Sequence, residues 1–318
     1  MGTDHDTVLR IRQNVAALGR GNWLLAVSGG MDSMVLLDAA VETLDHQNLT
    51  VATFDHRTGR AARTAARLVA ERSLELGVGC VSGAADTVGH SESDWRVARW
   101  GFLNAVAGRI GATVVTAHTL DDQIETVMIR ALRGAGPRGL AGLLAESAIA
   151  RPLLGTSRAE IAAYADVAGI RHIDDPSNSD RRHLRNRVRL DILPALERTS
   201  PGFSRSMLKI AEKAAVWRAQ MEAIALSFPM MSDSPQNHSF QRRPLRDFSV
   251  DSLRCLWPAL CARAGIVLDW RGTERLAAFT IEGATGQQIQ LSGGVRVHME
   301  RQTIDFRQAA SRPAKSHG

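Results

Sequence analysis

The stretch Asn22-Trp-Leu-Leu-Ala-Val27 decides the fold together with the loop that follows it, Ser28-Gly-Gly-Met-Asp-Ser33. The apolar run has the length of a buried β-strand, and the residues from Ser33 to Leu44 have helical spacing. Between them, paired glycines let the backbone approach an anion, and the amides that open the helix add partial positive charge. The unit therefore predicts a phosphate site. A Gly-Gly turn capped by Asp or Ser is the competing interpretation.

Asp32 adds a second expectation to this loop. A carboxylate beside a phosphate is repelled unless a divalent cation bridges the two, so Asp32 predicts Mg²⁺. The loop is not a Walker loop, because no Gly-Lys-Ser/Thr follows its glycines.

Strands and helices alternate through the first half of the chain. The predicted strands cover residues 22–27, 49–54, 78–81 and 113–117, and the predicted helices cover 33–44, 61–76, 94–108 and 121–133. Elements of this length and order predict an α/β fold with a parallel, doubly wound sheet. Ligands bind such sheets beyond the carboxyl ends of the strands, where Ser28–Ser33 and His118–Thr126 both fall.

The second of these segments reads Ala117-His-Thr-Leu-Asp-Asp-Gln-Ile-Glu-Thr126. The i, i+3 spacing of Asp122 and Glu125 puts both carboxylates on one face of the helix that begins at Asp121. Two such carboxylates could hold Mg²⁺ or bind a substrate ammonium group. Acidic residues near the positive end of a helix dipole are also common as capping groups, so both interpretations stay open.

The charge of the chain favours a polyanionic partner. Lys and Arg number 39 against 33 Asp and Glu, which gives a net charge of +6 and a pI near 10. Five arginines fall at positions 181, 182, 185, 187 and 189. Arg182, Arg185 and Arg189 are expected on one face of a helix that ends before Pro194. A solvated helix face on a slightly basic enzyme is the competing interpretation.

The second half of the chain loses the alternation. We expect a long helix at 203–227, a polar linker at 228–241, helices at 251–264 and 271–280, and short strands at 287–291, 295–300 and 303–306. This pattern predicts three parts, an α/β domain over 1–198, a helical connector and linker over 199–241, and a small α+β domain over 242–318.

Several classes of protein are poorly supported by the composition. Cys80, Cys255 and Cys261 form no C-x-x-C pair, so a disulfide framework, a zinc site and dithiol redox chemistry are not indicated. No apolar run approaches the about 18 residues of a membrane span, and the acidic start MGTDHDTVLR is not typical of a signal peptide. We therefore expect a cytoplasmic protein without a membrane partner.

The Ser28–Ser33 loop resembles the pyrophosphate loop of the N-type ATP pyrophosphatases, which adenylate a carbonyl-like oxygen and release pyrophosphate. Later motifs narrow the resemblance to the tRNA(Ile)-lysidine synthase family over about residues 23–196. In chain order they are Arg96-x-x-Arg99-Trp100, His118-x-x-Asp-Asp-Gln-x-Glu-Thr126, Arg133-Gly-Ala-Gly-Pro-Arg-Gly-Leu140, Arg151-Pro-Leu-Leu154, Asp175-Pro-Ser-Asn178 and Arg185-Asn-x-x-Arg189.

The chain departs from the family pattern in three places. Thr119 stands where the family has a second histidine, so a role for paired imidazoles is not carried over. Trp100 stands where tyrosine is usual, and the loop at Asp55-His56 loses the residues that normally follow.

The resemblance implies a ligase that uses ATP, Mg²⁺ and lysine to convert the wobble cytidine of a CAU-anticodon tRNA(Ile) into lysidine. The C2 oxygen of the base would attack the α-phosphate, giving an adenylated base and pyrophosphate, and the lysine ε-amine would then displace AMP. The oligomeric state stays open, a homodimer included.

The resemblance also assigns roles to residues of this chain. Residues expected to bind ATP are Ser28, Gly29, Gly30, Met31, Asp32 and Ser33. Catalysis is expected of Asp32, His118, Asp122 and Glu125, with Asp32 and Asp122 at Mg²⁺ and Glu125 at the amine. Residues expected to bind tRNA are Arg182, Arg185, Asn186 and Arg189, with Asn186 and the Asp175–Asn178 loop fixing the start of their helix. The small C-terminal domain is expected to contact tRNA as well.

Two other functions stay open. The first is another N-type ATP pyrophosphatase, either a tRNA thiolase, which would need catalytic or cluster-binding cysteines, or a glutamine-fed synthetase, which needs an amidotransferase domain or partner. The second is a non-catalytic module that senses ATP, which would leave the acidic motif and the arginines without a role.

Overall fold

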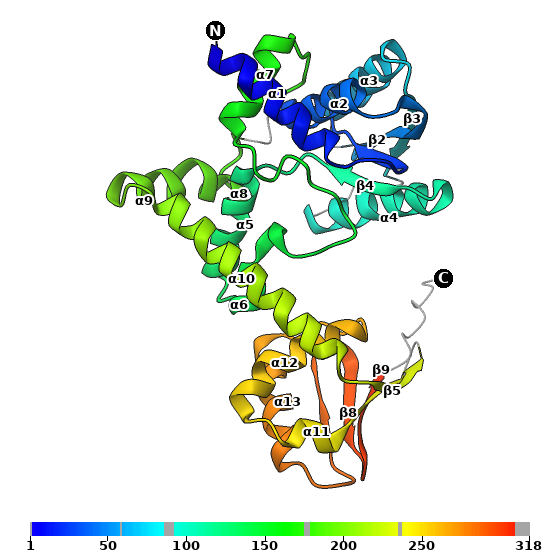
Figure 1. Ribbon diagram of the computed structural model, residues 1–318, viewed down its shortest axis with the longest axis vertical. Helices are drawn as coiled ribbons and strands as arrows, with labels where there is room; N and C mark the ends of the chain where they lie inside the picture. Colours follow the sequence, from blue (N-terminus) through cyan, green and yellow to red (C-terminus); the bar gives the residue numbers. More distant parts are fainter. Residues whose placement is uncertain (1, 58, 86–91, 175–178, 235–236, 309–318) are drawn as a thin grey trace. The chain divides into compact units, whose positions relative to one another are not determined.

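The computed structural model describes residues 2–57, 59–85, 92–174, 179–234 and 237–308 (Figure 1). Two compact units divide the chain. The first comprises Met1–Ala135 with Gly139–Lys213, and the second comprises Gly136–Arg138 with Ala214–Gly318. None of the helices in the described ranges has the length and apolar content that crossing a membrane requires.

A parallel sheet of four strands forms the centre of the first unit. Its strands are β1 (Trp23–Ala26), β2 (Leu49–Asp55), β3 (Gly79–Ala84) and β4 (Thr113–Thr116). They lie in the order β3-β2-β1-β4, and Trp23 of β1 pairs with Leu49 on one side and Thr113 on the other. The predicted α/β class and parallel sheet are confirmed.

Helices cover both faces of this sheet, as Figure 1 shows for α2 and α3 on one side and α4 on the other. The helices of the unit's core are α1 (Gly2–Ala16), α2 (Met31–Thr43), α3 (Arg60–Glu75), α4 (Glu92–Ile110), α5 (Leu120–Leu132) and α7 (Arg158–Ala168). Neighbouring residues of β1 point to opposite faces, since Leu25 joins one apolar cluster and Leu24 the other. Both are fully buried, so the sheet is doubly wound.

The strand order places the two informative loops together. Ser28–Ser33 follows β1, and the residues from His118 to Leu120 follow β4, which is the neighbour of β1. Because the strands are parallel, both loops leave the same edge of the sheet. Short elements complete the unit: η1 (His46–Asn48), η2 (Gly142–Leu144), and part of α6 (Pro137–Leu140).

The arginine-rich segment differs from its prediction. It forms α8 (Leu184–Arg187), a π-helical turn η4 (Val188–Ile192) and α9 (Leu193–Thr199). The expectation that the helix ends before Pro194 is wrong, because the helical run continues from Leu184 through the π turn to Thr199 and includes Pro194. The expected single face for Arg182, Arg185 and Arg189 is also wrong. Arg182 precedes α8, and the π turn breaks the 3.6-residue spacing.

The second unit contains a five-stranded antiparallel sheet in the order β5-β6-β9-β8-β7. The strands are β5 (Met230–Ser234), β6 (Asn237–Gln241), β7 (Gln288–Gln290), β8 (Val295–Met299) and β9 (Thr303–Gln308). The helices are α10 (Phe203–Leu226), which begins in the first unit, α11 (Arg242–Arg246), α12 (Val250–Arg263) and α13 (Trp270–Glu282), with a short η5 (Ser292–Gly294). The predicted small α+β part is confirmed.

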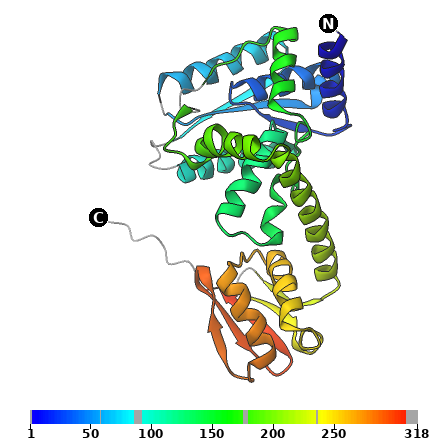
Figure 2. The same cartoon turned by 90° about the vertical axis from the view of Figure 1, so that its left-hand side faces the viewer.

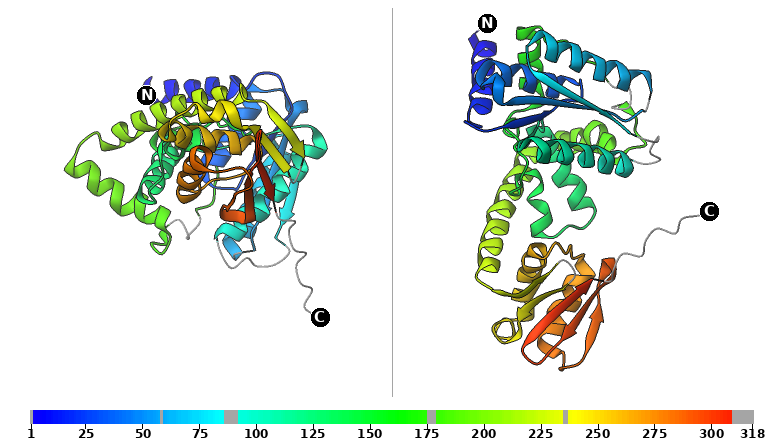
Figure 3. Two further views of the ribbon diagram at one scale, coloured as in Figure 1. Left: turned by 90° about the horizontal axis from the view of Figure 1, so that it is seen from below. Right: turned by 90° about the vertical axis from the view of Figure 1, so that its right-hand side faces the viewer.

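Aromatic packing holds this sheet to its helices, which Figures 2 and 3 show on one side of the strands. Trp257 of α12 lies with its ring centroid 5.4 Å from that of Phe306 and 5.8 Å from that of Phe240. Phe240 belongs to β6, so the predicted linker over 228–241 is wrong: most of it forms β5 and β6. The polar residues around Phe240 hid a strand whose burial depends on one aromatic side chain.

Candidate functional site

The loop from Ser28 to Ser33 has a conformation that requires glycine at position 29. Gly29 has a φ of +85°, a region that favours glycine. A Cβ atom there would lie 2.8 Å from the Cβ of Ala65 and 2.9 Å from its carbonyl oxygen. The Gly29 carbonyl also accepts a hydrogen bond from the N–H of Ile173 at 2.9 Å. Any side chain at this position would disturb the loop.

Two serines close the loop onto the start of α2. The Ser33 hydroxyl donates to the Gly30 carbonyl at 2.8 Å and accepts from the Ser28 N–H at 3.1 Å. The two hydroxyl oxygens are 3.2 Å apart. Since the first amides of α2 have no acceptor within the helix, they remain available to an anion. This geometry fits a phosphate group, as the sequence predicts for Ser28–Ser33.

Asp32 lies in the first turn of α2, among other acidic side chains. Burial raises its pKa, Asp122, Asp121 and Glu125 raise it further, and Arg158 opposes them. A cation beside Asp32 would relieve this repulsion. No group of three or more His, Cys, Asp or Glu side chains in the described ranges is arranged to hold a metal ion unaided. Mg²⁺ commonly takes only one or two carboxylates and completes its coordination with substrate phosphates, so Asp32 fits such a site.

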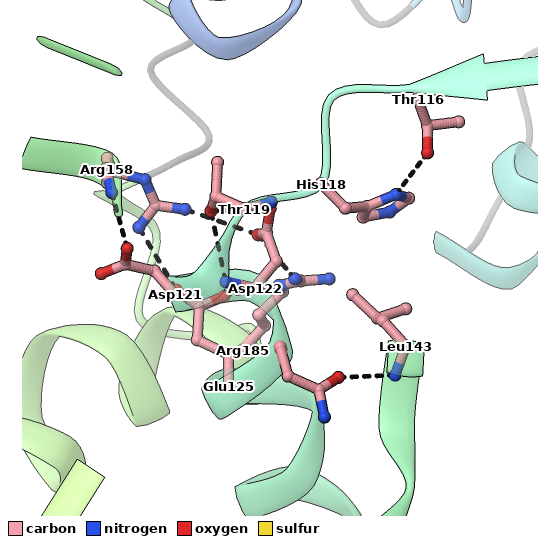
Figure 4. Close-up of polar contacts among 10 residues, drawn as sticks. Thr116, His118, Thr119, Asp121, Asp122, Glu125, Leu143, Arg158 and Arg185 are labelled. Atoms are coloured by element: carbon pink, nitrogen blue, oxygen red, sulfur yellow. Dashed lines mark hydrogen bonds and ion pairs between the residues drawn. The ribbon is translucent and has the colours of Figure 1, made fainter. Parts of the chain in front are cut away.

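The acid cluster, Asp121, Asp122 and Glu125, opens α5 at the neighbouring loop (Figure 4). Thr119 is the N-cap of this helix and is fully buried. The carboxylate of Asp122 accepts from the Thr119 N–H at 2.9 Å and from its hydroxyl at 3.2 Å, through the same oxygen. The capping interpretation is therefore confirmed for Asp122. Threonine, in the place of the family's second histidine, is a cap here.

Two arginines compensate the carboxylates of Asp122 and Glu125 (Figure 4). Arg185 donates through Nε to Glu125 at 2.7 Å and through Nη2 to Asp122 at 2.8 Å. Arg158 reaches the other oxygen of Glu125 at 3.3 Å and the same Asp122 oxygen as Arg185 at 3.5 Å. Each oxygen of the two carboxylates thus has a donor or cation. Glu125 is only 2% exposed, so this compensation matters for stability.

Asp121 has a different role from its neighbours. Its carboxylate accepts the backbone N–H of Arg158 at 2.7 Å, at the first position of α7. Leu120 donates its own N–H to the carbonyl of Thr156 at 2.9 Å. These contacts hold the starts of α5 and α7 against each other and place the guanidinium of Arg158 beside the acid cluster. Arg158 was not among the site residues predicted from the sequence, because nothing in its local pattern indicates that α7 begins beside α5.

The residues predicted to bind tRNA occupy different environments. Arg185 points into the acid cluster, so it does not share a helix face with Arg182 and Arg189 as expected. Asn186 is 9% exposed and donates to the Asp180 carbonyl at 2.9 Å. Arg182 is exposed and pairs with Asp180 at 2.6 Å, while Arg189 lies in the π turn. The Asp175–Asn178 loop lies outside the described residues.

His118 lies between the acid cluster and several arginines. Its Nδ1 is 2.7 Å from the hydroxyl of Thr116 (Figure 4). Burial lowers the pKa of His118 to about 4, with Arg151, Arg185 and Arg99 lowering it further and Asp122 opposing them. The imidazole is therefore neutral near pH 7, and suited to hydrogen bonding rather than to carrying charge.

Gln123 explains a further part of the acidic motif. It is fully buried, donates to the Ala141 carbonyl at 3.1 Å and accepts from the Leu143 N–H at 2.6 Å. Gly142 has a φ of +62°, and a Cβ atom there would lie 2.5 Å from the Gln123 side chain. Gln123 therefore fastens the glycine-rich loop to α5 and takes no direct part in the site.

Comparisons with known proteins agree with this geometry. A family described as "PP-loop domain" matches residues 3–196. A tRNA(Ile)-lysidine synthase from Novosphingobium aromaticivorans is 36% identical over 225 residues, covering 67% of this chain and 68% of that protein. The same named enzyme from Burkholderia mallei is 36% identical over 213 residues, but the match spans only 44% of that protein and 63% of this chain.

The fold also occurs among solved structures. The U34-tRNA thiolase NcsA from Methanococcus maripaludis, solved with its [4Fe-4S] cluster, has a TM-score of 0.50 and 20% identity. The match covers 66% of this chain and 78% of that one. At this identity the likeness supports the fold alone.

Proposed function

This chain belongs to the PP-loop proteins and, within them, to the tRNA(Ile)-lysidine synthase family, and from that premise we propose its reaction. It joins lysine to C2 of the wobble cytidine in a CAU-anticodon tRNA(Ile), in the cytoplasm, with ATP as energy source. The observation that carries the proposal is the shared sheet edge, where the Ser28–Ser33 loop lies beside the acid cluster.

In the first step, the C2 oxygen of cytidine attacks the α-phosphate of ATP, and pyrophosphate leaves. The amides at the start of α2 and the hydroxyls of Ser28 and Ser33 hold the leaving pyrophosphate. Asp32 would hold Mg²⁺, which when bound would neutralise negative charge on the phosphates. Asp122, whose oxygens already accept from Thr119, Arg158 and Arg185, joins this site only if one of those contacts is given up.

In the second step, the ε-amine of lysine attacks C2, the bond from C2 to the adenylate oxygen breaks, and AMP leaves. The amine must be neutral to attack, so its ammonium form first loses a proton. Glu125 is our proposed acceptor for that proton. It is held by two arginines, so a substrate ammonium can replace one of them while the other keeps the carboxylate in place.

Half-reaction assays on full-length tRNA test these roles. We expect Asp32→Ala to abolish pyrophosphate release while leaving tRNA affinity near normal. Glu125→Gln should still release pyrophosphate but transfer lysine slowly, so that AMP-linked RNA accumulates. A matched control is Glu71→Gln, which removes one charge from an exposed ion pair on α3 and should change neither step. Full pyrophosphate release by Asp32→Ala, or equal loss of both steps in Glu125→Gln, would contradict the assignments.

The alternative functions are tested by the same assay with glutamine or a sulfur donor in place of lysine. Cys80 and Cys255 are partly buried and Cys261 is fully buried, where burial raises the pKa of its thiol. None of these three belongs to a metal-binding group in the described ranges. A thiolase reaction is therefore poorly supported, and lysine is the expected substrate.

The open face of the second unit's sheet supports tRNA contact by the C-terminal part. Arg296 of β8 lies directly opposite Arg307 of β9, and Asn237 of β6 and Gln290 of β7 continue the same row. Like charges directly opposite each other are unfavourable unless an anion lies between them. Weak ion pairs from Arg307 to Glu300 at 3.6 Å and to Asp305 at 3.9 Å compensate only that arginine. Phosphates of the tRNA backbone are the anions we propose.

A further inference from the structure

Three arginines at the edge of the parallel sheet have no part in the steps above. We call Arg96, Arg99 and Arg151 the arginine cluster. Arg96 and Arg99 lie in the first half of α4, which links β3 to β4 and packs against β2 and β4. A helix between parallel strands runs opposite to them, so its beginning lies at their carboxyl ends. Arg151 follows Ala150, whose carbonyl accepts the N–H of Thr116 at the end of β4.

Among the residues that the structure describes, no acid compensates the arginine cluster. In the part of the chain that the structure describes, none of the three guanidiniums has a carboxylate within ion-pairing distance. The Nε atoms of Arg99 and Arg151 are buried and have no hydrogen-bond acceptor among the described residues. Arg151 uses another nitrogen for the Ser147 hydroxyl at 2.8 Å and the Leu143 carbonyl at 3.3 Å. Arg96 is exposed at the same edge.

Leaving these cations together lowers stability. Burial lowers the pKa of Arg99, and Arg96 and Arg185 lower it further. Burial likewise lowers the pKa of Arg151, with Arg96 adding to the effect. A buried donor without an acceptor and neighbouring like charges both disfavour the folded state. An anion at this edge would satisfy the Nε donors and relieve the repulsion.

Flat rings lie next to the arginine cluster. Trp95 is one turn before Arg99 on α4, so the two side chains share a face. Its ring centroid is 6.4 Å from that of His56, which follows β2 and lies 5.0 Å from the ring of Phe54. The same loop contains Arg57, a non-glycine residue with a φ of +56°. Strained backbone of this kind gathers at functional loops.

We propose that the arginine cluster, with His56 and Trp95, binds single-stranded RNA, the guanidiniums contacting phosphates and a ring stacking on a base. Single-stranded nucleic acid is bound in this way, by cations along the backbone and aromatic rings against bases. The occupant is RNA rather than ATP, because the pyrophosphate has its own amide site after β1 and does not need the rings. Free lysine offers one carboxylate to three cations. This inference rests on the proposed function, and it places the anticodon loop across α4 and the end of β2.

Binding of RNA fragments tests the proposal without requiring catalysis. The probes are a CAU anticodon stem–loop and a blunt duplex of the same stem, measured by fluorescence anisotropy across a KCl titration. We expect Arg96→Ala and Arg99→Gln each to weaken stem–loop binding and to lower its salt slope by about 0.7. Trp95→Leu should weaken stem–loop binding about tenfold with an unchanged slope, because stacking carries no charge. Binding of the duplex should change little in all three variants.

Arg109→Ala is the matched control, since Arg109 is an exposed arginine at the other end of α4. Stem–loop affinities and slopes equal to this control would overturn the proposal, as would an unchanged slope with a raised KM for ATP or lysine. Arg96 is exposed, so Arg96→Ala carries the test if Arg99→Gln fails to fold. The proposed function fails separately, if the wild-type chain binds the stem–loop but forms no lysidine on full-length tRNA.

Discussion

The acid cluster and the arginine cluster lie at one edge of one sheet and are built in opposite ways. Asp122 and Glu125 have a donor or cation at every carboxylate oxygen, supplied by Thr119, Arg158 and Arg185. In the arginine cluster, two buried Nε atoms have no acceptor within the described ranges. Groups that are fully paired are held in position before substrate arrives, which catalysis requires. Groups left unpaired become satisfied when a ligand of opposite charge binds.

The largest expected loss of stability comes from removing a cation that pairs with the acid cluster. Arg185→Ala removes the nearer cation from Glu125, which is 2% exposed, while Arg158 stays. Removing one partner of a buried ion pair strands the other, so we expect a loss of about 2–3 kcal/mol in the free energy of unfolding. Urea denaturation measures this loss.

Two variants make the Arg185 experiment specific. Arg182→Ala removes a neighbouring arginine that is 90% exposed and pairs with Asp180, and should cost about 0–1 kcal/mol. Arg185→Ala combined with Glu125→Gln should recover part of the stability lost in Arg185→Ala, because the stranded charge is gone. If Arg185→Ala kept full stability but lowered the salt slope of tRNA binding, Arg185 would belong to the RNA interface, as its sequence context suggested.

The parallel α/β fold could be predicted from the sequence because the segments that specify it are short and contiguous. The apolar run at Trp23–Ala26 and the glycine loop after it are contiguous, and the parallel order follows from alternating elements. Polar strands were harder to find. In β6, Phe240 contributes the main apolar contact to the core, so the stretch has the composition of a linker.

The candidate site could be predicted only in part, because its ion pairs join residues that are far apart in the sequence. Asp122 and Glu125 were located by a helical spacing, but their cations are 33 to 63 residues away in sequence. Nothing local distinguishes Arg185, which turns inward, from Arg182, which does not. The π turn at Val188–Ile192 also invalidates any face derived from a 3.6-residue period. Arg158 needed the contact of α7 with α5, which only the fold supplies.

The second largest effect is expected at Asp32, where a substitution should raise the free energy of unfolding instead of lowering it. Burial raises its pKa above the ordinary 3.8, so the folded state binds the proton more tightly than the unfolded state. Stability is therefore lost as pH rises through this range, and Asp32→Asn should be more stable than the wild type at pH 7. The difference should vanish below about pH 3.8, where the acid is protonated in both states. Urea denaturation at several pH values measures it.

Asp38 is the matched control for Asp32 on the same helix. It accepts from the Tyr164 hydroxyl at 2.9 Å and lies 3.6 Å from Arg72. Because this carboxylate is paired, Asp38→Asn should lower stability at pH 7. If both substitutions lowered stability equally, Asp32 would be a structural acid and not a group awaiting a cation.

The pKa of His118 responds to both the acid cluster and the arginine cluster. Its folded pKa of about 4 lies below the ordinary 6.5, so stability is fully present above pH 6.5 and is lost as pH falls through 4. Arg99→Gln should raise the pKa, because it removes a neighbouring cation, and Asp122→Asn should lower it further. NMR titration of the imidazole reports these shifts. A wild-type midpoint near 6.5 would show that the ring is solvated and lies outside the influence of both clusters.

The smallest expected effect is a change in the free energy of unfolding when an arginine of the arginine cluster is removed. Arg96 is exposed, lies near Arg99 and Arg151, and forms no ion pair among the described residues, so Arg96→Ala should remove repulsion without removing an ion pair. We expect the free energy of unfolding to rise by up to about 0.5 kcal/mol at low salt, and the gain to disappear near 1 M salt, where the Debye length falls to about 3 Å. Arg67→Ala, which breaks an exposed i, i+4 pair with Glu71, should instead lose about 0.3–0.5 kcal/mol. A salt-independent loss of stability in Arg96→Ala would mean that this arginine has a partner within the fold. Arg96 would then be paired, like the carboxylates of the acid cluster, and would not differ from them.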